Sequence, residues 1–223
     1  MPRSPSNPAI GIRRTSIGKT TKSASIDALD FLTSGAVTLI LAGMHGDEPK
    51  SVFVARKLLE HLDAHPPVGS VIIVPVVNPD GYALRRRGNA HRVDLNRNFP
   101  TQNWQPGRQK SRYYPGAESE PETRAVIRLI ERVRPRRIIT IHSIDRNRFC
   151  NNYDGPAKRI ASAMARRNGY PVAGDIGYPT PGSLGTYAGV ERRIPTVTLE
   201  LPSHHSPKRC WQDNAKALLW CCR

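Results

Sequence analysis

The chain has 223 residues, 38% of them hydrophobic, which is enough to bury one core. We expect a single catalytic domain over residues 1–223, with about the first ten residues as a flexible end. The 34 Lys and Arg residues outnumber 18 acidic ones, and the net charge of +16 favours anionic partners. Because the basic clusters are scattered and only 6% of residues are aromatic, nucleic-acid binding is not the expected main function.

Three further features indicate a cytoplasmic protein that does not enter a membrane. The longest apolar run, residues 35–44, is far shorter than the roughly 20 residues that a membrane span requires. The N-terminal residues are polar and rich in proline, without the apolar segment of a secretory signal. The four cysteines do not resemble the disulfide framework of a secreted domain.

Strand-like and helix-like segments alternate in the first half of the chain. Residues 37–41 are an apolar run that predicts a buried strand, and residues 48–62 place their apolar side chains on one helical face. A second buried strand is predicted over residues 71–77. Residues 78–118 then form a long segment rich in Gly, Asn and Arg, and a loop of that length in a compact domain is usually functional.

The second half continues the alternation. Ser119 with Glu122 is typical of a capping box at the start of a helix, and Asp154 can cap a later helix that Gly169 ends. The whole pattern predicts an α/β fold, a mostly parallel mixed sheet with helices on both faces. The segments expected here are a helix to residue 133, a strand at 138–141, a helix at 156–167, a strand at 195–201 and a helix at 207–220.

Polar residues follow several of the predicted strands. His45, Asn78, His142 and Glu200 all fall at or just beyond a strand's carboxyl end, where ligands bind in such sheets. We therefore expect them to lie near one another.

His45, Glu48 and His142 form the ligand set of a catalytic zinc, which needs three protein ligands and one open position. The spacing of His45 and Glu48 alone is weak evidence. Without further motifs, His45 could equally cap a turn and His142 could be a satisfied histidine at a strand end. On the metal interpretation we expect one zinc ion per chain.

Five motifs occur together in the order and approximate spacing of a known family. The chain resembles the zinc carboxypeptidase A family over about residues 37–202, and most of all its short bacterial branch, the murein peptide amidases. The motifs are His45-Gly46-Asp47-Glu48, Asn78-Pro79-Asp80-Gly81-Tyr82, Asp94-Leu95-Asn96-Arg97-Asn98-Phe99, Ile141-His142-Ser143 and Thr198-Leu199-Glu200-Leu201.

The resemblance implies a role for each residue of the metal centre. It makes His45, Glu48 and His142 the zinc ligands, and Asp94 the carboxylate that holds the other ring nitrogen of His45. Glu200 becomes the general base that takes a proton from the attacking water. A glutamate that ends an apolar run would also be costly to bury without a role.

The resemblance also implies substrate contacts. Asn96 and Arg97 would grip the terminal carboxylate of the substrate, for which a guanidinium offers two parallel hydrogen bonds. Arg87 would polarise the scissile carbonyl. Its neighbours Arg85, Arg86 and Arg92 are close enough in sequence that one of them could match the family's arginine in its place. Tyr178 corresponds to a mobile tyrosine that closes over substrate, but its spacing to Gly182 is one residue short of the pancreatic enzymes.

By resemblance the activity would be hydrolysis of murein (peptidoglycan) peptides at the bond between γ-D-Glu and meso-diaminopimelate. The partner would be a small peptide with a free C-terminal carboxylate. Three alternatives remain: a carboxypeptidase acting on ordinary peptides, an N-acyl amino acid deacylase of the aspartoacylase and succinylglutamate desuccinylase type, and a basic nucleic-acid-binding protein. The sequence does not determine the oligomeric state.

Overall fold

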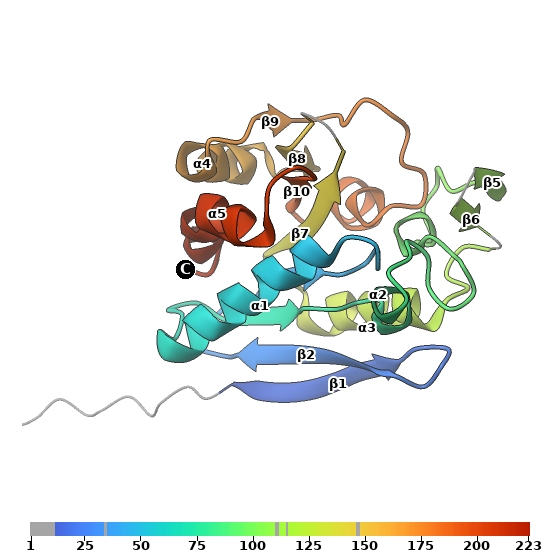
Figure 1. The fold of residues 1–223 in the computed structure, drawn as a ribbon, viewed down its shortest axis with the longest axis horizontal. Coiled ribbons are helices and arrows are strands. Elements are labelled where there is room, and N and C mark those ends of the chain that lie inside the picture. Colours follow the sequence, from blue (N-terminus) through green and yellow to red (C-terminus); the bar gives the residue numbers. More distant parts are fainter. Residues whose placement is uncertain (1–11, 34, 110–111, 115, 146–147) are drawn as a thin grey trace, which may run out of the picture.

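An eight-stranded sheet runs through the computed structural model, which describes residues 12–33, 35–109, 112–114, 116–145 and 148–223 (Figure 1). The flexible end predicted for residues 1–10 lies outside the described residues. The strands of this sheet, in chain order, are β1 (Arg13–Lys19), β2 (Ser25–Phe31), β3 (Thr38–Ala42), β4 (Val71–Val74), β7 (Arg137–Ile144), β8 (Cys150–Asp154), β9 (Val172–Ala173) and β10 (Thr196–Pro202).

The remaining elements surround the sheet or extend from it. A separate two-stranded hairpin is formed by β5 (Gly107–Gln109) and β6 (Arg112–Tyr114). The helices are α1 (Pro49–Ala64), α2 (Pro79–Ala83), α3 (Pro121–Val133), α4 (Lys158–Asn168) and α5 (Pro207–Cys221), with a 3-10 turn η1 (Leu95–Arg97) and a π-helical segment η2 (Gly185–Glu191).

The sheet is parallel in its centre and has antiparallel pairs on either side, with β9 parallel to β8 at one edge. The strand order is β1-β2-β4-β3-β7-β10-β8-β9, and β4, β3, β7 and β10 are parallel neighbours. Strands β1, β2 and β8 join their neighbours toward the centre in antiparallel fashion. This arrangement confirms the predicted mixed α/β sheet.

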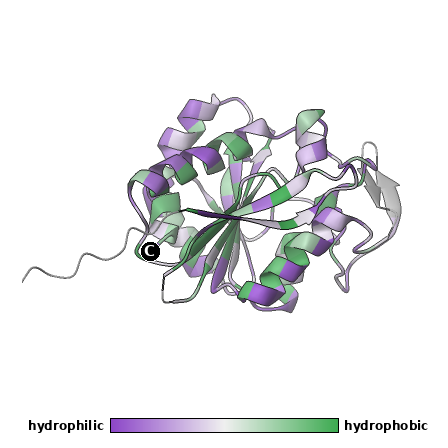
Figure 2. Cartoon of the chain, turned by 90° about the horizontal axis from the view of Figure 1, so that it is seen from below, coloured by the Kyte–Doolittle hydropathy of each residue, from purple (hydrophilic) through white to green (hydrophobic). Residues whose placement is uncertain are grey.

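Helices cover both faces of the sheet. One core is formed with α1, α4 and α5, and the other with α3 and η2. Figure 2 shows hydrophobic residues gathered in the central strands and on the helix sides next to them. The repeat of buried residues along α3 (Ala125, Val126, Leu129 and Ile130) explains why this segment is a helix that lies flat on the sheet.

Several expected boundaries and caps are wrong. Strand β4 ends at Val74 because Pro75 has no N–H to continue the ladder. The predicted capping box is absent, since Ser119 and Glu122 bond to other partners and the Glu122 carboxylate accepts from Asn89 instead. Asp154 closes β8 and does not cap α4.

Three parts of the sheet were not predicted: the hairpin of β1 and β2, strand β8 and the two-residue strand β9. The hairpin of β1 and β2 was missed because β1 has no fully buried residue and therefore shows no apolar alternation. Strand β8 was not predicted because it carries mostly polar residues. The segment 78–118 also contains α2, η1 and the β5-β6 hairpin and is not a structureless loop.

The strands bring the predicted site residues to one edge. The carboxyl ends of β3, β4, β7 and β10 meet there because these strands are parallel. Within the part of the chain that the structure describes, no helix is long and apolar enough to span a membrane.

Candidate metal centre and active site

The loop after β3 carries two of the three predicted ligands. His45 lies on it, and Glu48 is the residue immediately before α1. The Glu48 carboxylate makes no capping bond to the helix and is directed to the histidines instead. Gly46 allows the loop to lie directly on α2, since a Cβ there would be 2.0 Å from the backbone of Gly81.

The third ligand comes from β7, and the three side chains converge. His45 Nδ1 lies 2.7 Å from Glu48 Oε1, and His142 Nδ1 lies 3.1 Å from both Glu48 Oε2 and His45 Nδ1. All candidate ligand atoms lie within 4.8 Å of one another. A tetrahedral zinc with ligand bonds of 2.0–2.2 Å has its ligand atoms about 3.3 Å apart, so this donor set fits the ion.

Asp94, the residue before η1, holds the His45 ring from behind. Its Oδ1 lies 3.0 Å from His45 Nε2, and its Oδ2 accepts a hydrogen bond of 2.8 Å from Arg87 Nε. Burial alone would raise the pKa of Asp94, but His45 and Arg87 hold it well below its usual value. An ionised Asp94 fixes the His45 tautomer so that Nδ1 can act as the ligand atom.

Glu48 is also held in its ionised form. Burial raises its pKa, but the adjacent imidazoles of His45 and His142 outweigh this effect and lower the pKa well below its usual value. The backbone N–H of Ser143 donates to Glu48 Oε2 at 3.0 Å. The carboxylate is therefore anionic and oriented, as a metal ligand must be.

Glu200 lies beside this cluster on β10. It is directly opposite His142 in the parallel ladder between β7 and β10, and its side chain points to the same face. Burial raises the pKa of Glu200 to about 7. A carboxyl group that titrates near neutrality can both accept and return a proton, which suits a general base.

A cleft of about 1100 Å³ opens over these residues. Two predicted residues do not line it: Asp94 lies behind His45, and the side chain of Asn78 caps α2 instead. The predicted residues that line the cleft are His45, Glu48, Arg87, Asn96, Arg97, His142, Tyr178 and Glu200.

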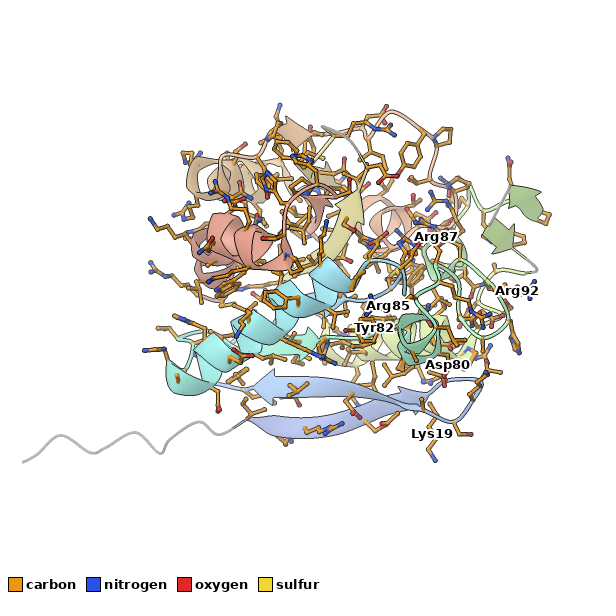
Figure 3. The ribbon with its side chains drawn as sticks, viewed as in Figure 1. Lys19, Asp80, Tyr82, Arg85, Arg87 and Arg92 are labelled. Carbon is orange, nitrogen blue, oxygen red and sulfur yellow. The ribbon has the colours of Figure 1, made fainter. Side chains whose placement is uncertain are left out.

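The structure distinguishes Arg87 from its neighbours in sequence. Figure 3 shows Arg85, Arg87 and Arg92 spread along the loop that follows α2, and among the arginines on this loop only Arg87 lines the cleft. Its Nη1 lies 3.4 Å from Glu48 Oε1, in addition to its bond with Asp94. The guanidinium is thus fixed beside the metal ligands.

Asn96 and Arg97 form part of the cleft wall on η1. Asn96 Oδ1 accepts a hydrogen bond of 2.9 Å from the N–H of Leu184, which joins η1 to the segment before η2. Arg97 is only 4% exposed, and its Nη1 donates to the carbonyl of Asn96 at 2.6 Å. The side chain of Arg97 is therefore held in place before any substrate arrives.

Tyr178 lies across the cleft with a cationic neighbour. The guanidinium of Arg148 is 5.6 Å from the centre of its ring. Arg148 and Lys50 also line the cleft, and neither was predicted. Lys50 lies only two residues beyond Glu48, so its position could have been inferred, whereas nothing in the local sequence marks Arg148.

Comparison with known proteins agrees with this geometry. A family model described as zinc carboxypeptidase matches residues 10–209. The chain belongs to the zinc carboxypeptidase family. The family is zinc-dependent, and its members are metal-dependent peptide hydrolases, so the prediction of an enzyme is confirmed.

Individual zinc carboxypeptidases cover most of this chain. Murein peptide amidase A of Vibrio campbellii is 36% identical over 208 residues, which are 86% of this chain and 80% of the relative. Murein peptide amidase A of Escherichia coli K12 is 35% identical over 177 residues, 74% of this chain and 70% of the relative.

Solved structures of the family share the fold. The murein-tripeptide amidase of Escherichia coli O157 has a TM-score of 0.73 and 29% identity, with 92% of this chain and 91% of that chain covered. Carboxypeptidase A of Helicoverpa armigera has a TM-score of 0.75 at 20% identity and covers 94% of this chain and 66% of its own, and it shows the fold alone.

Proposed function

We propose that this zinc carboxypeptidase is a murein peptide amidase that cleaves the bond between γ-D-Glu and meso-diaminopimelate. The observation that carries the proposal is the convergence of His45, Glu48 and His142 beside Glu200 in a cleft lined by cationic side chains. The relatives named murein peptide amidase, which match most of the chain, support this substrate.

One zinc ion per chain would be held by His45 Nδ1, His142 Nδ1 and the Glu48 carboxylate. When bound, the ion lowers the pKa of a water molecule and polarises the scissile carbonyl. Glu200 takes the proton of the attacking water and gives it to the leaving amine. Burial of Glu200 supports this exchange because it brings the pKa of the carboxyl close to neutral.

The arginines of the cleft would orient the substrate. Arg87 lies beside the ligands, where its guanidinium can stabilise the negative charge that develops on the carbonyl oxygen. Arg97 and Asn96 hold the free carboxylate of the residue that is released, and Tyr178 covers it from the other side. Their positions on the cleft wall support these roles.

We further propose that the enzyme acts as a single catalytic domain in the cytoplasm. One eight-stranded sheet joins strands from β1 near the start of the described residues to β10 near their end, which supports one domain. Its four cysteines are buried free thiols, as is usual in a reducing compartment.

The test is a comparison of three substrates with zinc-loaded protein. The substrates are L-Ala-γ-D-Glu-meso-diaminopimelate, an ordinary L-tripeptide with a free carboxylate, and an N-acyl amino acid, with products identified by mass. We expect free diaminopimelate from the first and little product from the others. Glu200→Gln provides the inactive control. Turnover of the ordinary peptide alone would support a general carboxypeptidase and contradict the proposal.

A further inference from the structure

Basic clusters that lie apart in the sequence meet at one end of the fold. The parallel strands β3, β4, β7 and β10 all begin at this end, and the cleft lies at the opposite end, where they finish. Figure 1 shows the C-terminus at this end, far from the turn that joins β1 to β2. We call it the basic end, and its arginines are Arg134, Arg136, Arg137, Arg167, Arg193 and Arg223.

Hydrogen bonds join the segments of the basic end into one surface. The backbone N–H of Arg136 donates to the carbonyl of Val37 at 2.9 Å, and the guanidinium of Arg136 donates to the carbonyl of Arg223. Arg137 Nη2 donates to the same carbonyl at 3.4 Å. Gly69, in the loop before β4, lies against this point, since a Cβ there would be 3.0 Å from the backbone carbon of Arg223. The arginines are therefore held beside the loop that leads into β4.

Acidic side chains do not neutralise the basic end. Among the described residues, none of its six arginines forms an ion pair with a carboxylate. Asp30 already has an arginine partner on β1 at 2.9 Å. Asp63 at the end of α1 and Glu131 at the end of α3 are exposed acids close by. Burial and the adjacent charge of Arg136 lower the pKa of Arg137, which agrees with a cation that lacks an anionic partner.

Two apolar side chains project from the same end. Val68 is 86% exposed and Leu32 is 43% exposed. Thr33 Oγ1 donates to the carbonyl of Val68 at 3.4 Å, so the chain after β2 lies beside the loop before β4. Exposed apolar side chains among cations are typical of proteins that bind the surface of a bilayer, because the apolar groups enter the acyl boundary while the cations face the lipid phosphates.

Other anionic partners fit this end less well. The guanidiniums of Arg167 and Arg137 lie 4.6 Å and 5.6 Å from the ring of Trp220. A ring already occupied by guanidiniums is a poor platform for the bases of a nucleic acid. Val68 and Leu32 would find no apolar partner on a phosphodiester backbone. A second copy of the same surface would bring like charges together.

We propose that the basic end is a docking surface for a bilayer that contains anionic lipids. Val68 and Leu32 enter the boundary between headgroups and acyl chains, and the guanidiniums of Arg136 and Arg223 bind lipid phosphates. The cytoplasmic leaflet is anionic, which agrees with the proposed location. Attachment of this kind is peripheral and requires no membrane-spanning helix. It leaves the cleft at the opposite end of the sheet facing away from the bilayer.

Vesicle sedimentation with the zinc-loaded protein tests the proposal and requires no turnover of any peptide. The vesicles contain phosphatidylcholine either alone or mixed with phosphatidylglycerol, and the sedimented fraction gives the partition constant. We expect binding to the mixed vesicles only. A rise of about tenfold in ionic strength should release most of the protein, because salt screens the attraction between exposed charges. Absence of binding to the anionic vesicles at low ionic strength overturns the proposal.

Two pairs of substitutions test the position of the surface. Arg136→Gln combined with Arg223→Gln should weaken binding to anionic vesicles about 25-fold, because each cation near such a surface contributes about fivefold. Lys19→Gln combined with Lys22→Gln is the matched control. These exposed lysines lie at the far end of the sheet, where Figure 3 labels Lys19, and their loss should change binding less than about twofold. An equal loss in both pairs overturns the proposal, because net charge alone would then explain the attraction.

A third substitution separates a bilayer from other anionic partners. Val68→Asn leaves the charge unchanged and should weaken vesicle binding about tenfold, because an inserted apolar side chain is lost. Leu84→Asn is its control, since Leu84 is 52% exposed but lies outside the basic end, and it should not alter binding. Unchanged binding of Val68→Asn overturns the proposal. Binding of double-stranded DNA in preference to the anionic vesicles also overturns it and would make the basic end a nucleic-acid site.

Discussion

Replacing Asp154 with Asn should make the ligand-free protein more stable at neutral and alkaline pH. The pKa of the carboxyl rises from 3.8 to about 6 because of burial. At 1.36 kcal/mol per pH unit, the difference of about 2.2 units corresponds to an upper limit of about 3 kcal/mol. Because the side chain is partly exposed, solvent screens the charge, and we expect about 1 to 2 kcal/mol.

The direction of the pH dependence follows from the raised pKa. Below pH 3.8 the carboxyl is protonated in both the folded and the unfolded protein, and its ionisation costs the fold nothing. Between pH 3.8 and 6 the unfolded chain loses its proton first, so the free energy of unfolding falls as the pH rises. Asn has no such cost, and the advantage of the variant is complete above pH 6.

Thermal unfolding at pH 5 and pH 8, with equal metal content in every sample, measures this effect. For a chain of this size we expect the variant to gain about 3 to 6 °C in Tm at pH 8 and clearly less at pH 5. Asp63→Asn, at an exposed position on α1, is the control and should show no pH-dependent gain. A variant that is less stable than wild type at pH 8 would refute the reasoning, since the Asp154 carboxylate would then have a favourable partner within the fold.

Three further predictions concern the catalytic residues. Metal analysis should find one zinc per chain, and His45→Ala or His142→Ala should abolish tight binding because only two protein ligands remain. Glu200→Gln should keep zinc and lower kcat by roughly 10²- to 10⁴-fold, whereas Glu48→Gln should weaken zinc binding itself; loss of zinc from Glu200→Gln would show that the roles are wrongly assigned. Amidation of the substrate's terminal carboxylate should lower kcat/KM because Arg97 loses its anionic partner, and the activation free energy should rise by about 2 to 4 kcal/mol. Equal turnover of the free and the amidated substrate would contradict that contact.

The metal centre could be predicted from the sequence because its residues follow apolar strands. His142 ends the predicted part of β7, and Glu200 ends the apolar run of β10, so a parallel sheet must bring them together. His45 and Glu48 follow β3 within a short loop. These positions depend on parallel pairing of the strands, which the alternation of strand-like and helix-like segments predicts.

The polar residues that share the sheet face of His142 and Glu200 could not be predicted in the same way. Asp154 fits the local pattern of a helix cap as well as that of a strand end, and only the antiparallel pairing of β8 with β10 decides between the two. Thr140 and Asn152 are distant in sequence and become neighbours of Thr198 through strand register. Register depends on tertiary contacts, which a single sequence does not reveal.

Asp94 has a consequence for attempts to change what this enzyme accepts. One of its oxygen atoms orients His45, and the other holds Arg87, so a single carboxylate serves both the metal and the group beside the reacting carbonyl. A library that varies position 87 will therefore disturb metal retention at the same time. Directed evolution at this cleft should recover changes at positions 87 and 94 together, and screens that supply excess zinc should tolerate more of them.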